Sequence, residues 1–374
     1  MKKKEVCWLT VAFMSVYHLA LIILLPLYLI QKGIPSWGII ISTIIVYCIT
    51  GLGVTAGYHR FYSHITYKLN PIAEFFMMTA GTLSVASTAL KWSYDHRLHH
   101  KYVDTEKDPY NINKGFMWAH LWWIFFKRQT WDDKVVKDLL KNKMVVFQDK
   151  YYFPLLAASN ILLTVFLGWL FNDYFGAIVF TLLFRIFLTH HSMYFINSLA
   201  HFYGSKPYSS EHTAVNNWLI SLLTFGEGYH NFHHTFAYDY RNGVRWYQFD
   251  PTKMLIWTLS KLGIASDLKT VDRYLIYQAL IREDERQMLK QIEKIEDQDR
   301  KEALIAEVKE KAEALYAQIK ELNKKIAEYY KLKKAEKKEH LEELKQLINE
   351  LKAQFKQAFK EWGLLCEPLI VEHY

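Results

Sequence analysis

The stretch WGIIISTIIVYCITGLGVTAGYHRFYSH, residues 37–64, joins a long apolar run directly to a pair of histidines. Its apolar part, Trp37–Gly57, approaches the roughly 20 apolar residues that a helix needs to cross a bilayer. A fifth apolar segment, Ile72–Leu90, is broken by Gly81, so we expect it at the membrane interface or inside the protein. The sequence therefore predicts an all-α membrane protein with four transmembrane helices. Its other three spans are Cys7–Ile30, Tyr151–Phe171 and Tyr174–Phe195.

The chain divides into two parts of unlike composition. The apolar runs lie within residues 1–260, whereas residues 264–362 contain no Gly or Pro and are dense in Lys and Glu. We therefore expect a membrane domain over residues 1–275 and a C-terminal helical extension over residues 276–374.

The charges beside the apolar runs indicate the orientation. The link between the first two runs carries only Lys32, the link at Asn172–Asp173 carries no basic residue, and residues 59–150 carry 14 Lys and Arg. The chain also begins MKKK, and basic loops stay on the cytosolic side. We expect a multi-pass protein whose two termini and histidine clusters face the cytosol. The first run is too long for a typical signal-peptide core, so we expect it to remain as an anchor.

Four short histidine clusters follow or adjoin the apolar runs: HRFYSH, HRLHH, NSLAH and HNFHH. Imidazole is the commonest neutral metal ligand, and so many at short fixed spacings are typical of a metal site. No Cys or Glu is interleaved at zinc-site spacing, which argues against a structural zinc module. Nine imidazoles exceed what one ion can hold, so the sequence predicts two metal ions. The predicted ligands are His59, His64, His96, His99, His100, His201, His230, His233 and His234.

Helical spacing indicates which imidazoles can converge. Within HRLHH, positions i, i+3 and i+4 share one helical face, so His96 with His99 or His100 can approach one point. HNFHH repeats this pattern. Asn197 and His201 are i and i+4 at the end of the fourth run, again on one expected face.

The first cluster has a less favourable spacing. His59 and His64 are five residues apart, about 140° around an ideal helix. They can approach one centre only if the helix bends or ends between them, or if they serve two metals. Outside the clusters, His120 and His191 are the best candidates for side chains that support the ligands from behind.

These motifs, with the segments DHRLHHKYVDTEKDPYN, GFMWAH, GEGYHNFHH and DYRNG, resemble the membrane acyl-CoA (stearoyl-type, Δ9) fatty acid desaturases over about residues 8–270. The resemblance implies four membrane helices under a cytosolic helical cap that holds a di-iron site. It also implies O2-dependent insertion of a cis double bond, Δ9, into a long saturated acyl-CoA such as stearoyl-CoA or palmitoyl-CoA. By motif position, the nine clustered histidines are then iron ligands, and Asn197 completes one iron's shell.

The resemblance further implies how an acyl chain is held. Trp92 lies one helical turn before His96 and would shape the acyl tunnel. Tyr47 and Gly51 would close its far end, and a bulky Tyr47 predicts a limit near C18. Met193 occupies the place at the acyl bend where the family's eukaryotic members carry Thr.

Basic residues at the membrane edge suggest a head-group site. Lys127 and Arg128 follow GFMWAHLWWIFF, and such a pair can hold phosphates by charge and bidentate hydrogen bonds. The same pair could instead anchor the topology. Asp95 matches a family acid near the CoA end, but Tyr94 stands where eukaryotic members carry Arg. The carrier therefore stays open between CoA, an acyl carrier protein and a lipid ester.

The C-terminal extension is predicted to be helical, because 38 of the 80 residues from Ile281 to Lys360 are charged and none is Gly or Pro. Residues 308–329 carry a coiled-coil-like seam that is lost across KLKKAEKKEH and resumes at Leu344. Two helices folding back on each other would explain the break. The extension lacks the HPGG haem motif, so we expect electrons from a separate cytochrome b5- or ferredoxin-type donor. Its basic residues are mixed with acids, which argues against a nucleic-acid partner.

Two rival interpretations remain. A membrane di-iron fatty-acyl or alkane hydroxylase uses similar histidines and the same oxidant, although the GEGYHNFHH context argues against it. A non-catalytic membrane protein could bind zinc through the same histidines and use the helical extension to bind a partner.

Overall fold

The computed structural model describes residues 5–128, 131–335 and 340–369, so the basic start MKKK lies outside the described residues. The chain forms two compact units, and the second unit takes one short segment from the middle of the chain. The first consists of Met1–Gly204 and His212–Thr270, and the second of Ser205–Glu211 and Val271–Tyr374.

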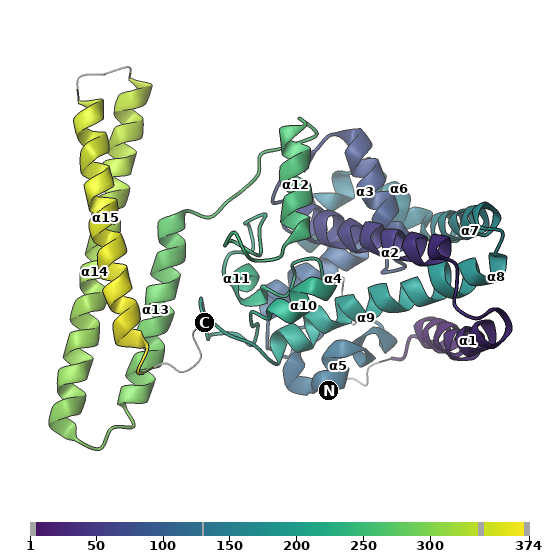
Figure 1. Cartoon of the computed structure of the whole chain (residues 1–374), viewed down its shortest axis with the longest axis horizontal. Coiled ribbons are helices and arrows are strands. Elements are labelled where there is room, and N and C mark those ends of the chain that lie inside the picture. The colour runs from purple at the N-terminus through teal and green to yellow at the C-terminus, as the bar shows by residue number, and fades with distance from the viewer. Residues whose placement is uncertain (1–4, 129–130, 336–339, 370–374) are drawn as a thin grey trace. The chain divides into compact units, whose positions relative to one another are not determined.

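Four long apolar helices confirm the predicted membrane spans. They cover Trp8–Lys32, Trp37–Ser63, Tyr152–Leu170 and Tyr174–His201, and their axes follow roughly one common direction in Figure 1. Large apolar side chains such as Ile22, Ile44 and Phe166 are exposed on them, as expected of surfaces that face lipid. The protein is therefore an integral membrane protein. The segment Ile72–Leu90 is not among these spans, in agreement with the prediction.

Two of the spans are not regular α-helices throughout. The second span begins as α2 (Trp37–Leu52), whose first turn is capped by Ser36, and continues as a π-helix, η1 (Gly53–Ser63). The fourth span changes geometry repeatedly along its length. The helices of the four spans are α1 (Trp8–Lys32), α2, η1, α7 (Tyr152–Leu170), α8 (Tyr174–Gly176), the π-helix η6 (Ala177–Phe184), α9 (Arg185–Asn197) and the 3-10 turn η7 (Leu199–His201).

Shorter helices complete the first unit and carry six of the nine clustered histidines. Side-chain caps define where several of them begin: Asn70 accepts a hydrogen bond from the Ala73 amide, and Thr88 accepts one from the Lys91 amide. The α-helices are α3 (Pro71–Leu83), α4 (Ala89–Tyr102), α5 (Phe116–His120), α6 (Lys143–Lys150), α10 (Trp218–Leu223), α11 (His230–Thr235) and α12 (Pro251–Lys261). The 3-10 turns are η2 (Ile112–Lys114), η3 (Trp122–Phe125), η4 (Asp133–Val136) and η5 (Leu139–Lys141), and β1 (Lys68–Leu69) pairs antiparallel with β2 (Ala265–Ser266).

The second unit is built from three long helices, α13 (Arg273–Ile292), α14 (Gln298–Lys334) and α15 (Leu341–Cys366). Figure 1 shows α15 lying along α14, so the two helices fold back on each other as the interrupted seam suggested. Part of the interrupting segment, residues 336–339, lies outside the described residues. Helix α13 begins shortly before the expected domain boundary between residues 275 and 276. The buried core of this unit consists of Tyr274, Ile281, Met288, Ile292, Val308, Ala312, Leu315, Ile319, Leu322, Phe355, Trp362 and Cys366.

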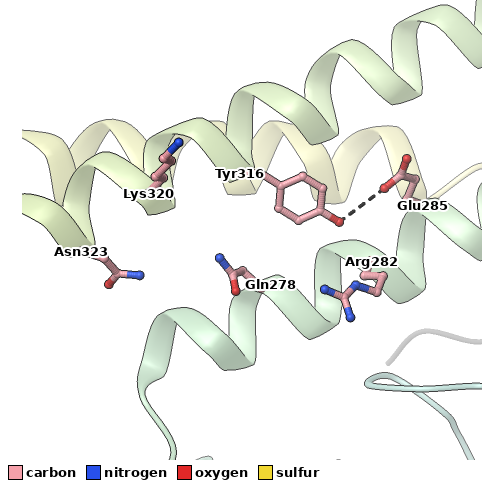
Figure 2. A pocket seen from close by; sticks show the side chains of 6 residues that line it. All are labelled: Gln278, Arg282, Glu285, Tyr316, Lys320 and Asn323. Atoms are coloured by element: carbon pink, nitrogen blue, oxygen red, sulfur yellow. Dashed lines mark hydrogen bonds between the residues drawn. The ribbon is translucent and has the colours of Figure 1, made fainter.

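An open groove of about 660 Å³ runs between α13 and α14 (Figure 2). Its lining is polar, and across it the Tyr316 hydroxyl donates a hydrogen bond of 3.3 Å to Glu285. The other lining residues are Gln278, Arg282, Lys320 and Asn323.

Candidate metal centre

The nine clustered histidines lie in two compact groups, within each of which one nitrogen per ring lies within 4.8 Å of the others. Several ring nitrogens are much closer: Nε2 of His59 lies 2.9 Å from Nε2 of His233, and Nε2 of His99 lies 3.2 Å from Nε2 of His234. We name them the first group, His59, His64, His96, His100 and His233, and the second group, His99, His201, His230 and His234.

The π-helix explains how the first cluster reaches one group. In η1 the backbone hydrogen bonds run from residue i+5 to residue i, as from the His64 amide to the His59 carbonyl at 3.1 Å. In this geometry, two residues five apart therefore point in more similar directions around the helix axis than they do on an α-helix. The helix also ends at Ser63, between the two histidines, which is one of the three ways the sequence left open. Both His59 and His64 belong to the first group.

Each HxxHH motif supplies both groups. On α4, His96 and His100 belong to the first group and His99 to the second. On α11 the assignment is reversed, because His230 and His234 belong to the second group and His233 to the first. Positions i and i+4 thus stay together while position i+3 reaches the other group, so the two short helices hold the groups at a set separation. The rings of His100 and His234 stack at 4.2 Å where the groups meet.

Carboxylates lie behind one ligand in each group. Nδ1 of His59 lies 2.8 Å from Oε2 of Glu227, and Nδ1 of His99 lies 2.9 Å from Oδ1 of Asp108. A proton held at Nδ1 by such an acid leaves the Nε2 lone pair directed into the group. Sequence reasoning missed both acids, although each stands in a quoted motif, GEGYHNFHH or DTEKDPYN, within ten residues of a histidine.

Glu227 is itself held by a buried network. Arg60 donates to its Oε1 at 2.8 Å, Asn242 donates to its Oε2 at 2.7 Å, and Asp250 pairs with the same guanidinium. Burial alone would raise the pKa of Glu227, but the charge of Arg60 and the contact with His59 lower that pKa to about 2. The carboxylate is therefore ionised and can only accept hydrogen bonds, and its Oε2 lies 2.8 Å from Nδ1 of His59.

Several of these imidazoles are held neutral by their surroundings. Burial, followed by the neighbouring imidazoles, lowers the pKa of His96, His100 and His233 well below the usual value. A neutral ring keeps one nitrogen lone pair, which is the form that binds a metal. Convergent, buried and neutral imidazoles therefore fit a transition-metal ion in each group.

The end of the fourth span differs from the expected α-helix. Helix α9 stops at Asn197, and a 3-10 turn carries His201 into the second group. The expectation that Asn197 and His201 share one α-helical face is therefore wrong, because the helix tightens after Asn197. Asn197 is half-buried at the end of α9, four residues before His201. The Nδ1 atom of the His201 ring lies 2.8 Å from the Thr213 hydroxyl.

His120 and His191 were expected to support the ligands, but their rings hydrogen-bond to each other at 3.1 Å. Nδ1 of His120 lies 3.0 Å from Ser198, and Nε2 of His191 lies 3.1 Å from His18 on α1. In the part of the chain that the structure describes, the side chains found behind the ligands are instead Glu227, Asp108 and Thr213, together with Tyr110 at 3.3 Å from Nδ1 of His96.

The residues expected to enclose an acyl chain lie in two places, against the first group and around a narrow cavity. Trp92 stacks on His96 with ring centroids 4.9 Å apart. Tyr47, Gly51 and Met193 line a cavity of only about 10 Å³, the space that about one water molecule needs. The Tyr47 hydroxyl donates to the Leu223 carbonyl at 2.7 Å and accepts from Ser192 at 2.8 Å, which fixes its ring across the space.

Phe225 lines the same cavity and was missed by sequence reasoning. Its ring lies 5.2 Å from that of Tyr47 and covers the α-carbon of Gly51 so closely that a Cβ there would collide with it. Phe225 also has a positive φ of 56°, which is uncommon for a residue with a side chain. The only sequence signal that could have pointed to Phe225 was its position directly before the GEGYHNFHH motif.

The two basic residues expected at the head group pair with different acids. Arg128 donates through Nε to Asp95 at 2.6 Å and also through Nη2, whereas Lys127 pairs with Glu5 at 2.9 Å. Burial raises the pKa of Asp95 although the charge of Arg128 opposes that shift. Tyr94 stacks on Trp131 at 4.1 Å.

Comparisons with known proteins agree with this site. The fatty acid desaturase family model matches residues 35–263. The chain is 41% identical over 236 residues to a probable acyl-CoA desaturase of Schizosaccharomyces pombe, covering 62% of this chain and 49% of that protein. It is 36% identical over 260 residues to acyl-CoA desaturase 1 of Saccharomyces cerevisiae, covering 69% of this chain and 51% of that protein.

The alignment with a bacterial relative covers more of that relative's length. The chain is 32% identical over 274 residues to the sn-1 stearoyl-lipid 9-desaturase of Anabaena variabilis, covering 72% of this chain and 97% of that protein. By contrast, the chain spans about half the length of the two yeast proteins. On the family match and these identities, the chain belongs to the fatty acid desaturase family.

Proposed function

We propose that the protein is an O2-dependent oxidoreductase that inserts a cis double bond, at Δ9, into a long saturated acyl chain carried by CoA. The observation that carries the proposal is the arrangement of nine imidazoles in two adjacent groups beside membrane spans. The names of the relatives support the reaction, because they include acyl-CoA desaturases and 9-desaturases.

We propose two iron ions as the occupants of the two groups. All nine predicted histidines would act as ligands, and Asn197 would complete the shell of one iron. An unactivated methylene has no acidic proton, so bound iron with O2 would supply the oxidising power that side-chain acids and bases lack. The residues of the chain orient the imidazoles: Glu227 lies against Nδ1 of His59, and Asp108 lies against Nδ1 of His99.

The apolar side chains then position the substrate. Trp92 lies against His96, and the methylene chain would pass it before reaching Tyr47 and Phe225, which close the path. A closed end sets the number of carbons between the methyl terminus and the first group. It also excludes water from the apolar path, which protects the oxidising chemistry from side reactions.

The direction of the acyl chain follows from the same arrangement. The carrier's phosphates would bind at the membrane edge near Lys127 and Arg128, with Asp95 holding Arg128 in place. The active site and both chain termini would face the cytosol, and electrons would come from a cytochrome b5- or ferredoxin-type protein.

A lipid-bound acyl chain is the second candidate substrate. It is favoured by the relative whose length is almost fully covered, which is a stearoyl-lipid desaturase. Tyr94 and Met193 also depart from the residues of eukaryotic acyl-CoA enzymes. Arg128 is already neutralised by Asp95, which leaves less free positive charge for a nucleotide phosphate.

The test is a reconstituted reaction with purified protein in lipid nanodiscs, supplied with iron, a reductase system and O2. We expect two iron ions per chain and conversion of stearoyl-CoA to oleoyl-CoA by gas chromatography. His233→Ala should abolish conversion, whereas His340→Ala, an exposed histidine in the second unit, should not. Conversion of stearoyl-lipid but not of stearoyl-CoA would establish the second candidate substrate. A hydroxylated product would indicate a hydroxylase. Bound zinc without any product would refute the proposal that the protein is an enzyme.

A further inference from the structure

The segment Ser205–Glu211 lies in sequence between two members of the second group, His201 and His230, yet it packs with the C-terminal helices as part of the second unit. The chain therefore leaves the first unit after Gly204 and returns at His212. Among the described residues before Val271, the second unit takes only this segment. We call Ser205–Glu211 the crossing loop.

Two residues of α13 hold the crossing loop. Glu283, whose exposed fraction is only 2%, accepts a hydrogen bond of 2.9 Å from the Ser210 amide. Arg286 donates to Oε1 of Glu211 at 2.6 Å and to the Ser210 hydroxyl at 3.3 Å. A buried carboxylate is costly unless it is hydrogen-bonded, and Gln287 supplies another of its contacts at 3.0 Å. Glu283 therefore favours the conformation in which the loop lies on α13.

The residues directly after the loop touch the second group. His212 has its ring 5.2 Å from that of His234. The Thr213 hydroxyl donates to Asp104 at 2.6 Å, so it can only accept from Nδ1 of His201 at 2.8 Å. This contact holds the His201 proton at Nδ1 and directs Nε2 into the second group.

We propose that the C-terminal helices position the second histidine group, and that Glu283 and Arg286 are positioning residues that act through the crossing loop on Thr213 and His201. This rests on the proposed metal-binding role of the histidines. The C-terminal unit would then help to retain the metal ion at the second group. The first group has no member within the segment bounded by His201 and His230, so its ion should be unaffected.

The experiment measures how fast a chelator removes each iron from full-length protein in nanodiscs, together with backbone hydrogen exchange of residues 205–213. Glu283→Ala and Arg286→Ala should each release one of the two ions about tenfold faster, within the range of about 10–100-fold for partners of metal ligands. The second ion should leave at the wild-type rate, and exchange of the loop should rise. Glu283→Gln, which keeps an acceptor for the Ser210 amide, should restore most of the retention.

Arg282→Ala is the matched control, because Arg282 lies one turn earlier on α13 and lines the groove toward α14 (Figure 2). It should behave as the wild type. Arg286 is 40% exposed at its side chain, so its variant should fold even if Glu283→Ala does not. Faster loop exchange without faster loss of an ion would overturn the proposal, as would equal acceleration for both ions. Failure of the wild type to bind two ions would instead refute the proposed function.

Discussion

Removal of the Phe225 ring should lengthen the acyl chains that the protein accepts. The ring is 8% exposed, lies on Gly51 and contacts Tyr47, and the cavity beside it has only about 10 Å³ of space. With the ring present, carbons beyond the limit near C18 that the bulky Tyr47 predicts for this chain have no room. Phe225→Gly removes the ring and also relieves the positive φ, which costs a residue with a side chain about 1–2 kcal/mol.

The size of the effect follows from burial of methylenes. Each buried CH2 contributes about 0.8 kcal/mol, so two further methylenes contribute about 1.6 kcal/mol. At about 1.4 kcal/mol per factor of ten, the ratio of kcat/KM for a C20 chain to that for a C18 chain should rise by up to about 14-fold. Loss of the ring should cost about 3–5 kcal/mol of unfolding free energy, reduced by the relief of backbone strain.

The assay is competition between C16, C18 and C20 substrates, with products separated by gas chromatography. Tyr47→Ala should shift the profile in the same direction, while Tyr47→Phe keeps the ring and should leave the profile near wild type. Gly51→Ala should shorten the accepted chain, because its Cβ would push into the Phe225 ring. An unchanged C20-to-C18 ratio in both Phe225→Gly and Tyr47→Ala would show that the path ends elsewhere.

Three other outcomes follow from buried contacts. Glu227→Gln should weaken metal binding at the first group by about 10–100-fold while sparing the second, measured by chelator competition; equal loss at both groups would contradict this. Because the folded pKa of Glu227 is lowered from 4.5 to about 2, its contribution to stability is present above about pH 4.5 and lost as the pH falls through 2. Acid titrations of the metal-free protein should therefore show a shallower stability loss over that window in Glu227→Gln, and parallel curves would refute the assignment. Trp362→Phe should lower the unfolding free energy of the C-terminal unit by about 1–3 kcal/mol, because the indole N–H that bonds buried Asp284 at 2.9 Å is lost. Metal content should stay unchanged, and a loss of iron in Trp362→Phe would contradict a purely local effect.

Local patterns were enough for the spans and for the C-terminal helices. An apolar run of sufficient length must be helical in a bilayer, because every backbone group has to be hydrogen-bonded within the segment. The seam from Val308 to Leu322 is buried as its spacing predicted, since the 3.6-residue period relates neighbours along one helix. The histidines were likewise recognisable as candidate metal ligands, because their residue type and number are properties of short segments.

The structure differs from the sequence predictions where the backbone departs from ideal α-helical geometry. The π-helix through His59 brings the first cluster together, and the 3-10 turn after Asn197 carries His201 into its group. Neither is visible in residue identity, because both depend on how the helix is packed and on what hydrogen bonds its last turn can make. Phe225 was hidden for a similar reason: nothing in an aromatic residue before GEGYHNFHH signals a positive φ or a ring placed on Gly51.

The amino-acid sequence by itself therefore determined the membrane class, the family resemblance and the nine imidazoles, because these depend on composition and short-range spacing. Only the tertiary structure decided how the nine divide into five and four, which acids stand behind them, and that the crossing loop belongs with the C-terminal helices. The physical reason is that these features join segments far apart in the chain, such as Glu227 with His59 and Ser210 with Glu283. Such contacts depend on how helices cross, which the periodicity of any single helix does not contain.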